Sequence, residues 1–145
     1  MNPSTPVSDL TRLLQSMRPV LNPGVYAFVS VPPETDIGPL RPIATFREAE
    51  GLTLIVDESE AGRAGLKILF RAAWLTLTVH SDLQAVGLTA AVAAALTRAN
   101  ISCNVVAASF HDHIFVPVDA AQKALATLQA LQREAITQAG AIGAS

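Results

Sequence analysis

Residues 73–99, AWLTLTVHSDLQAVGLTAAVAAALTRA, hold the clearest secondary-structure pattern of this chain. From Ala73 to His80, apolar and polar side chains alternate, which is the period of a half-buried strand. From Val86 to Ala99, apolar residues recur at the spacing of one helical face. The stretch therefore predicts a strand, a polar turn and a helix, in that order.

Two further strands and a last helix are predicted downstream. The strands cover Ile101–Ala108 and His113–Val118, and a turn at Ser109–Asp112 joins them. Asp119 and Gln122 have the residue types and spacing of a capping box, which predicts that the last helix begins there. Its apolar stripe consists of Leu125, Leu128, Leu131 and Ala135. The order β-α-β-β-α gives five of the six elements of a ferredoxin-like βαββαβ unit.

The strands of the first half repeat this order only in part. One strand is predicted over Tyr26–Val31, and the proline-rich segment 32–42 that follows is predicted to be an irregular loop. Ile43–Glu48 and Leu52–Asp57 are predicted to form a hairpin. A further strand is possible at Lys67–Phe70. The first half therefore resembles a degraded copy of the second, with a loop in place of the first crossover helix.

Two helices are also expected in the first half. The apolar stripe in Leu10–Met17 predicts an N-terminal helix. Asp57 and Glu60 have capping-box spacing, which predicts a short helix over Ser59–Ala64. We therefore divide the chain into a first unit at residues 1–70, which includes the N-terminal helix, a second unit at 71–139 and a frayed tail at 140–145.

Composition limits the classes of protein to which this chain can belong. It has 145 residues, of which 50% are hydrophobic and 15% charged, and a formal net charge of −2. These values argue against disorder and against a nucleic-acid partner. No apolar run is long enough to span a membrane, so no membrane partner is expected. Cys103 stands alone, which excludes an intrachain disulfide and favours the cytoplasm. No cofactor-binding motif is present, so no cofactor is expected.

Three segments carry a resemblance to a known family. They are Phe46-Arg47-Glu48-x-Glu50-Gly51-Leu52-Thr53, Ser81–Thr89, and Phe110-His111-Asp112-His113-Ile114-Phe115-Val116-Pro117. They resemble bacterial proteins of unknown function built from tandem ACT domains, and they are similar to the ACT modules of the CASTOR arginine sensors. The resemblance implies an α+β fold of tandem ferredoxin-like units, with antiparallel sheets and helices on one face. It also implies amino-acid binding and a regulatory role. A homodimer is expected because a five-element unit leaves a sheet edge open, which pairing of the two halves or dimerisation would cover.

The topology also predicts a site. In a βαββαβ unit the first and third strands are antiparallel neighbours, so the turn after Ala73–His80 and the turn before His113–Val118 meet at one end of the sheet. A helix N-terminus there offers free N–H groups and a positive dipole to a carboxylate. Gly87 would let a ligand approach the backbone closely. The predicted ligand-binding residues are His80, Ser81, Asp82, Val86, Gly87, Leu88, His111, Asp112 and His113.

Other interpretations of these residues stay open. Ser81 and Asp82 have residue types that would serve only to cap the helix. The His111-Asp112-His113 segment has the residue types of a metal site, and Ser81, His111 and Asp112 have those of a catalytic triad. Neither interpretation enters the predicted site, for which no metal ligand and no catalytic residue is expected.

The leading hypothesis is a non-catalytic, amino-acid-sensing regulatory protein that acts as a homodimer. The first alternative is a structural or protein-interaction module without a ligand. The second is a small metal-dependent enzyme. Glu48 and Glu50 could be paired catalytic carboxylates, but two glutamates beside a hairpin glycine are more typical of solvated turn charge.

Overall fold

The computed structural model describes residues 9–79 and 82–143. In chain order the elements are α1 (Leu10–Ser16), β1 (Pro19–Leu21), β2 (Tyr26–Val31), β3 (Ala44–Arg47), β4 (Leu52–Asp57), α2 (Glu58–Arg63), β5 (Phe70–Leu77), α3 (Leu88–Arg98), β6 (Asn104–Ala107), β7 (Asp112–Pro117), the 3-10 turn η1 (Val118–Ala120) and α4 (Ala121–Gly143). The predicted order β-α-β-β-α of the second half is confirmed.

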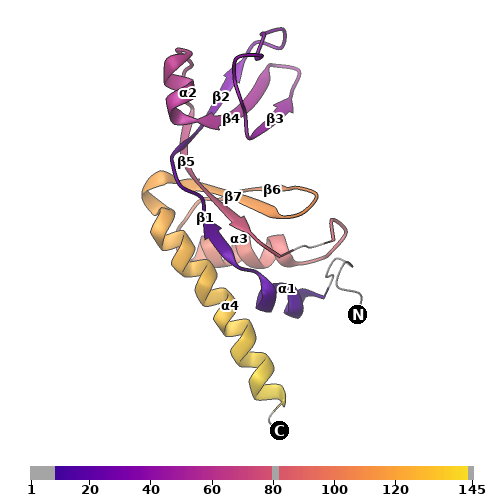
Figure 1. Cartoon of the computed structure of the whole chain (residues 1–145). Helices are drawn as coiled ribbons and strands as arrows, with labels where there is room; N and C mark the ends of the chain where they lie inside the picture. Colours follow the sequence, from indigo (N-terminus) through magenta and orange to yellow (C-terminus); the bar gives the residue numbers. More distant parts are fainter. Residues whose placement is uncertain (1–8, 80–81, 144–145) are drawn as a thin grey trace.

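The strands form one seven-stranded antiparallel sheet in the order β3-β4-β2-β5-β7-β6, and β1 also pairs with β5 (Figure 1). β5 is shared by both halves, since Phe70–Ala72 pair with β2 and Ala72–Leu77 pair with β7. The strand predicted at Lys67–Phe70 is wrong except for Phe70, which begins β5, and the strand predicted at Ala73–His80 corresponds to the rest of β5, which ends at Leu77. The α+β class with an antiparallel sheet is confirmed.

β1 and β2 lie along the same edge of β5, separated by a turn that the sequence marks with Asn22-Pro23-Gly24. Gly24 has a φ of 99°, which favours glycine. The backbone N–H of Asn22 donates to the carbonyl oxygen of Trp74 at 2.8 Å. Its side-chain amide donates to the hydroxyl of Thr76 at 2.9 Å. Asn22 thus supplies hydrogen bonds to β5 where the strand edge is interrupted.

The helices cover one face of the sheet and enclose two cores. Helices α1, α3 and α4 pack on the second-half strands, around Leu13, Leu75, Leu96, Ile114 and Leu128. Helix α2 packs on β2 and β4, around Val29, Leu54, Val56 and Ala61. Fully burying one such leucine or valine contributes roughly 1.5–3 kcal/mol. The N-terminal helix therefore packs on the core of the second half, while the division at residues 70 and 71 stays a prediction.

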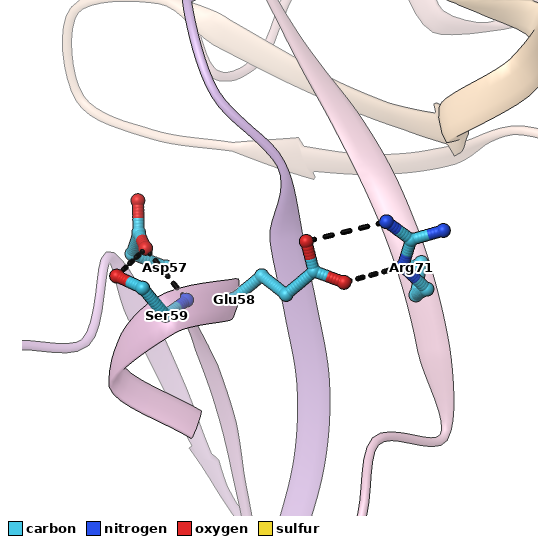
Figure 2. A network of polar contacts seen from close by, with 4 residues as sticks. All are labelled: Asp57, Glu58, Ser59 and Arg71. Atoms are coloured by element: carbon cyan, nitrogen blue, oxygen red, sulfur yellow. Dashed lines mark hydrogen bonds and ion pairs between the residues drawn. The ribbon is translucent and has the colours of Figure 1, made fainter. Parts of the chain in front are cut away.

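Two capping predictions differ from the structure. Asp57 is the N-cap of α2, and its carboxylate accepts from the Ser59 N–H at 2.8 Å (Figure 2). Glu60 does not complete a capping box there, because its carboxylate accepts from the Arg41 N–H at 2.9 Å and holds the preceding loop. Asp119 lies inside η1, which precedes α4, and not at a helix cap.

An ion pair also ties α2 to the shared strand. Arg71 of β5 donates from two guanidinium nitrogens to the Glu58 carboxylate, and Figure 2 shows the two side chains meeting between the helix and the strand. The pair is solvent-exposed, so water and salt screen it. It links the start of α2 to β5, while α2 itself packs on β2 and β4.

The other sheet face is aromatic. Tyr26, Phe28, Phe70, Trp74 and Phe115 make edge-to-face and stacked contacts there, with ring centroids 5.2–6.2 Å apart. Ala72 and Ile55 are buried among these rings. Trp74 therefore packs within its own chain, on the face opposite Leu75 and Leu77.

Candidate functional site

The pairing of β5 with β7 brings the two predicted turns together. Leu77, at the end of β5, pairs with Asp112, at the start of β7. Just beyond them, Nδ1 of His111 lies 3.5 Å from the carbonyl oxygen of Val79. His80 and Ser81, which were predicted to bind the ligand, lie outside the described residues. The antiparallel juxtaposition on which the site prediction depended is confirmed.

A small cavity of about 50 Å³ lies at this end of the sheet. It is lined by Asp82, Leu83, Ala85, Leu88, Thr89, Ala107 and Asp112. Three predicted residues, Asp82, Leu88 and Asp112, share this cavity. Val86 and Gly87 belong to the same turn without lining it. Ala107 lines the cavity but was not among the predicted residues. Its pairing with Asp112 in the β6–β7 hairpin is the signal that could have indicated it.

The start of α3 forms one wall of this cavity. Its N-cap is Gly87, with a φ of 105° and, among the described residues, no side chain that caps the helix. The first helical bond runs from the Ala91 N–H to the Gly87 carbonyl oxygen at 2.9 Å. The N–H groups of the first turn, beginning at Leu88, therefore have no acceptor within the helix. They can donate to an anionic group, which the helix dipole also favours.

Asp82 has a role different from capping. Its carboxylate accepts from the Gln84 N–H at 2.8 Å, and its carbonyl oxygen accepts from the Ala85 N–H at 2.9 Å. These bonds close the turn from Asp82 to Ala85, before the N-cap of α3. The interpretation of Asp82 as only a helix cap is therefore wrong, and Asp82 is one of the residues that line the cavity.

Asp112 supplies the opposite wall. It is only 7% exposed and lies on the helix-covered face of β7, in line with the core residues Ile114 and Val116. Among the described residues, no buried side-chain oxygen or nitrogen lacks a hydrogen-bond partner, which is what a buried carboxylate requires. The cavity thus joins helix N–H groups to a buried carboxylate.

The space beside Gly87 is occupied. A β-carbon added to Gly87 would lie 3.1 Å from Cδ2 of Leu10, in α1. Glycine is therefore favoured here by the positive φ and by the packing of α1. The expectation that Gly87 leaves room for a ligand is not met on the side that faces Leu10.

His113 lies away from this cavity because consecutive strand residues point to opposite faces. Its Nδ1 accepts from the Trp74 indole N–H at 3.0 Å and lies 3.2 Å from the Thr76 hydroxyl oxygen. Burial, followed by the nearby His111, lowers the pKa of His113, whereas Asp112 acts in the opposite direction. The structure therefore separates His113 from the residues with which it was grouped.

The metal interpretation gains no support in the part of the chain that the structure describes. No group of three or more histidine, cysteine, aspartate or glutamate side chains is arranged there to hold a metal ion. Ser81, one of the three residues with the types of a catalytic triad, lies outside the described residues. Elsewhere, the Glu48 carboxylate accepts from the Thr53 hydroxyl at 2.9 Å, and both Glu48 and Glu50 are exposed, as expected for turn charges.

Exposed apolar side chains lie in the two turns at this end of the sheet. Leu83 and Val86, in the turn before α3, are 67% and 82% exposed, and Phe110, in the turn before β7, is 68% exposed. Exposed apolar residues that gather at one place are typical of interaction surfaces. In residues 9–79 and 82–143, no helix is both long enough and apolar enough to cross a bilayer.

Comparison with protein families gives two matches, and both are models of the ACT domain. They cover residues 5–73 and 70–130 and meet within β5. A solved structure of a Vibrio cholerae protein of unknown function, described as a possible transport protein, is 49% identical to this chain. The match covers 85% of this chain and 95% of that one, with a TM-score of 0.77.

More distant solved structures are similar in fold alone. The ligand-free regulatory subunit of aspartate kinase from Thermus thermophilus is 10% identical, with 78% of this chain and 95% of that chain covered and a TM-score of 0.61. Aspartokinase III of E. coli, in complex with aspartate and ADP, is 12% identical, with 78% and 32% covered and a TM-score of 0.58. A comparison with functionally curated proteins finds no match.

Proposed function

This chain belongs to the ACT domain family, with two ACT domains in tandem, and from that premise we propose that it is a non-catalytic regulatory protein that binds an amino acid. ACT domains are regulatory modules that commonly bind amino acids. The proposed site is the cavity between the start of α3 and Asp112.

One observation carries this proposal: the cavity has two walls of opposite electrostatic preference. The first turn of α3, which no described side chain caps, suits a carboxylate. The carboxylates of Asp82 and Asp112 suit an ammonium group, with which they can form charge-assisted hydrogen bonds. A zwitterionic amino-acid head group satisfies both walls at once.

The size of the cavity indicates how such a ligand would bind. About 50 Å³ is roughly the volume of two water molecules in the liquid. A complete amino acid does not fit unless the turn from Asp82 to Gly87 opens. Binding would therefore shift the position of this turn, which connects β5 to α3, and so favour one conformation of the protein over another.

A homodimer is part of the proposal. The exposed side chains of Leu83, Val86 and Phe110 lie in the turns that border the cavity, where a second copy could cover them and close the site. ACT domains often oligomerise. We place the protein in the cytoplasm because it has a single cysteine, Cys103, and no disulfide.

A thermal-shift screen of the twenty amino acids tests the function. A ligand at 100 times its dissociation constant stabilises the native state by about 2.7 kcal/mol, which corresponds to a rise in Tm of roughly 5–10 °C for a chain of this size. Asp112→Asn is expected to abolish the rise. Asp119→Asn, an exposed aspartate in η1, is the matched control and is expected to retain it. No rise with any amino acid at millimolar concentration would refute the proposal.

The small cavity and the exposed apolar turns also favour a second function, a protein-interaction module with an empty site. That module would form an assembly and show no amino-acid response. Sedimentation of native protein and of Val86→Ser, combined with the thermal screen, distinguishes the two. If the protein is an interaction module, Val86→Ser is expected to sediment as a smaller species than the native protein. No amino acid is then expected to change the Tm of the native protein or of the variant.

A further inference from the structure

A second cavity, of about 110 Å³, lies on the aromatic face of the sheet, away from the proposed amino-acid site. It is lined by Ile43, Ala44, Val106, Ala108, His113 and Phe115. The first two come from the β3 edge and the next two from the β6 edge, although β3 and β6 are the outermost strands of the sheet. Both edges lie on the right of Figure 1. The sheet therefore curls until its two edges share a cavity, with β7 as its floor.

The walls of this cavity are apolar except at one point. Five of the six lining residues have hydrocarbon side chains, and His113 is the sixth. An indole N–H can only donate, so its bond to Nδ1 of His113 leaves Nδ1 without a proton. The neutral ring then carries its proton on Nε2. His113 thus supplies the only side-chain donor among the lining residues.

We propose that this cavity is a second binding site, which takes a small uncharged aliphatic molecule whose carbonyl or hydroxyl oxygen accepts from Nε2 of His113. The volume sets the size of the molecule, since an apolar cavity of about 150 Å³ holds benzene, with its six carbons. By proportion, about 110 Å³ holds roughly four carbons. The apolar walls and the neutral imidazole disfavour a charged group, because no lining side chain offsets its desolvation.

The occupant would bridge the two halves of the chain. Ala44 belongs to the first half and Val106 to the second, so a molecule between them contacts both edges of the curled sheet. This inference is independent of the amino-acid site, because the two cavities lie on opposite faces of the sheet and share no residue.

Trp74 gives a direct readout of this cavity. It is the only tryptophan of the chain, donates to His113 and stacks on Phe115. The full-length protein would be titrated with isobutanol, which has four carbons and one hydroxyl, and with isobutyrate, its anionic counterpart. Indole N–H chemical shift and tryptophan fluorescence are expected to change saturably with isobutanol, with an affinity at least about tenfold higher than for isobutyrate. Equal affinities, or a change that does not saturate, would overturn the proposal.

Substitutions of the lining residues test whether isobutanol binds in this cavity. Ala44→Leu fills the cavity from the β3 edge and is expected to abolish the saturable change. Ala49→Leu, in the exposed turn of the same hairpin, is the matched control and is expected to retain it. If Ala44→Leu does not fold, Val106→Phe fills the cavity from the opposite edge. A saturable change that survives the filling substitution would overturn the assignment.

Discussion

Acidification tests the environment of His113 most directly. In the folded protein, burial and the nearby His111 lower the pKa of His113 below its ordinary value of 6.5, against the opposing effect of Asp112. The protonated ring also has a hydrogen on Nδ1, so it can no longer accept from Trp74. We expect the free energy of unfolding to decrease as the pH falls below 6.5.

The sign and size of this effect follow from proton binding. Below pH 6.5 the unfolded chain takes up a proton at His113, whereas the folded chain stays neutral until its lowered pKa is reached. The unfolded state thus binds more protons in this window, so stability rises with pH across it and is constant above it. One proton changes the free energy of unfolding by at most about 1.4 kcal/mol per pH unit. Burial of the ring is the largest source of the slope, followed by the nearby His111.

Urea unfolding, followed by Trp74 fluorescence between about pH 5 and pH 8, measures this slope. The control is His113→Gln, in which an amide oxygen accepts from the indole and takes up no proton. The stability difference between the native protein and the variant is expected to change only below pH 6.5. Ser59 lowers the pKa of Asp57, and Arg71 lowers the pKa of Glu58. Both carboxylates therefore change stability only at more acidic pH, and they do so equally in the native protein and in the variant. Parallel curves throughout the range would refute the reasoning.

Three further predictions concern stability. Gly51→Ala places a β-carbon 2.8 Å from the Val31 carbonyl oxygen and is expected to cost about 1–3 kcal/mol in urea unfolding. Gly62→Ala, in α2 with no atom near its β-carbon, is the control and is expected to stabilise by up to about 1 kcal/mol; equal effects would contradict the geometry. Leu128→Ala removes a fully buried side chain of α4 and is expected to cost about 2–5 kcal/mol by the same measurement. Asp57→Ala removes the α2 cap and is expected to cost about 1 kcal/mol in thermal unfolding followed by circular dichroism, and an unchanged Tm would show that the cap is dispensable.

Most of the second half could be predicted because its periodicity is strong. The alternation in β5 and the apolar stripe of α3 placed both elements within a few residues of their ends. β1 could not be predicted, because Pro19–Leu21 is too short for a period and is defined by its pairing with β5. The sequence did not predict that β5 runs without a break through Ala72. Ala72 and Ala73 are both buried, so the strand does not alternate between buried and exposed residues there.

Only the part of the candidate site that follows from strand topology could be predicted from the sequence. Antiparallel pairing placed the turn containing Asp82 beside Asp112. The same alternation rule would have separated His113 from Asp112, because neighbouring strand residues face opposite sides. The packing of Leu10 beside Gly87 joins segments far apart in the sequence, and no local pattern indicates it.

The sharing of β5 has a consequence for how the chain acquires its structure. A slip of β5 by one residue would turn Leu75 and Leu77 out of one core and, at its other end, displace Arg71 from its pairing with Ala27. Neither ACT domain can correct its strand register without disturbing the other. Both registers must therefore be set in a single cooperative step, and the two domains are expected to unfold together in one transition.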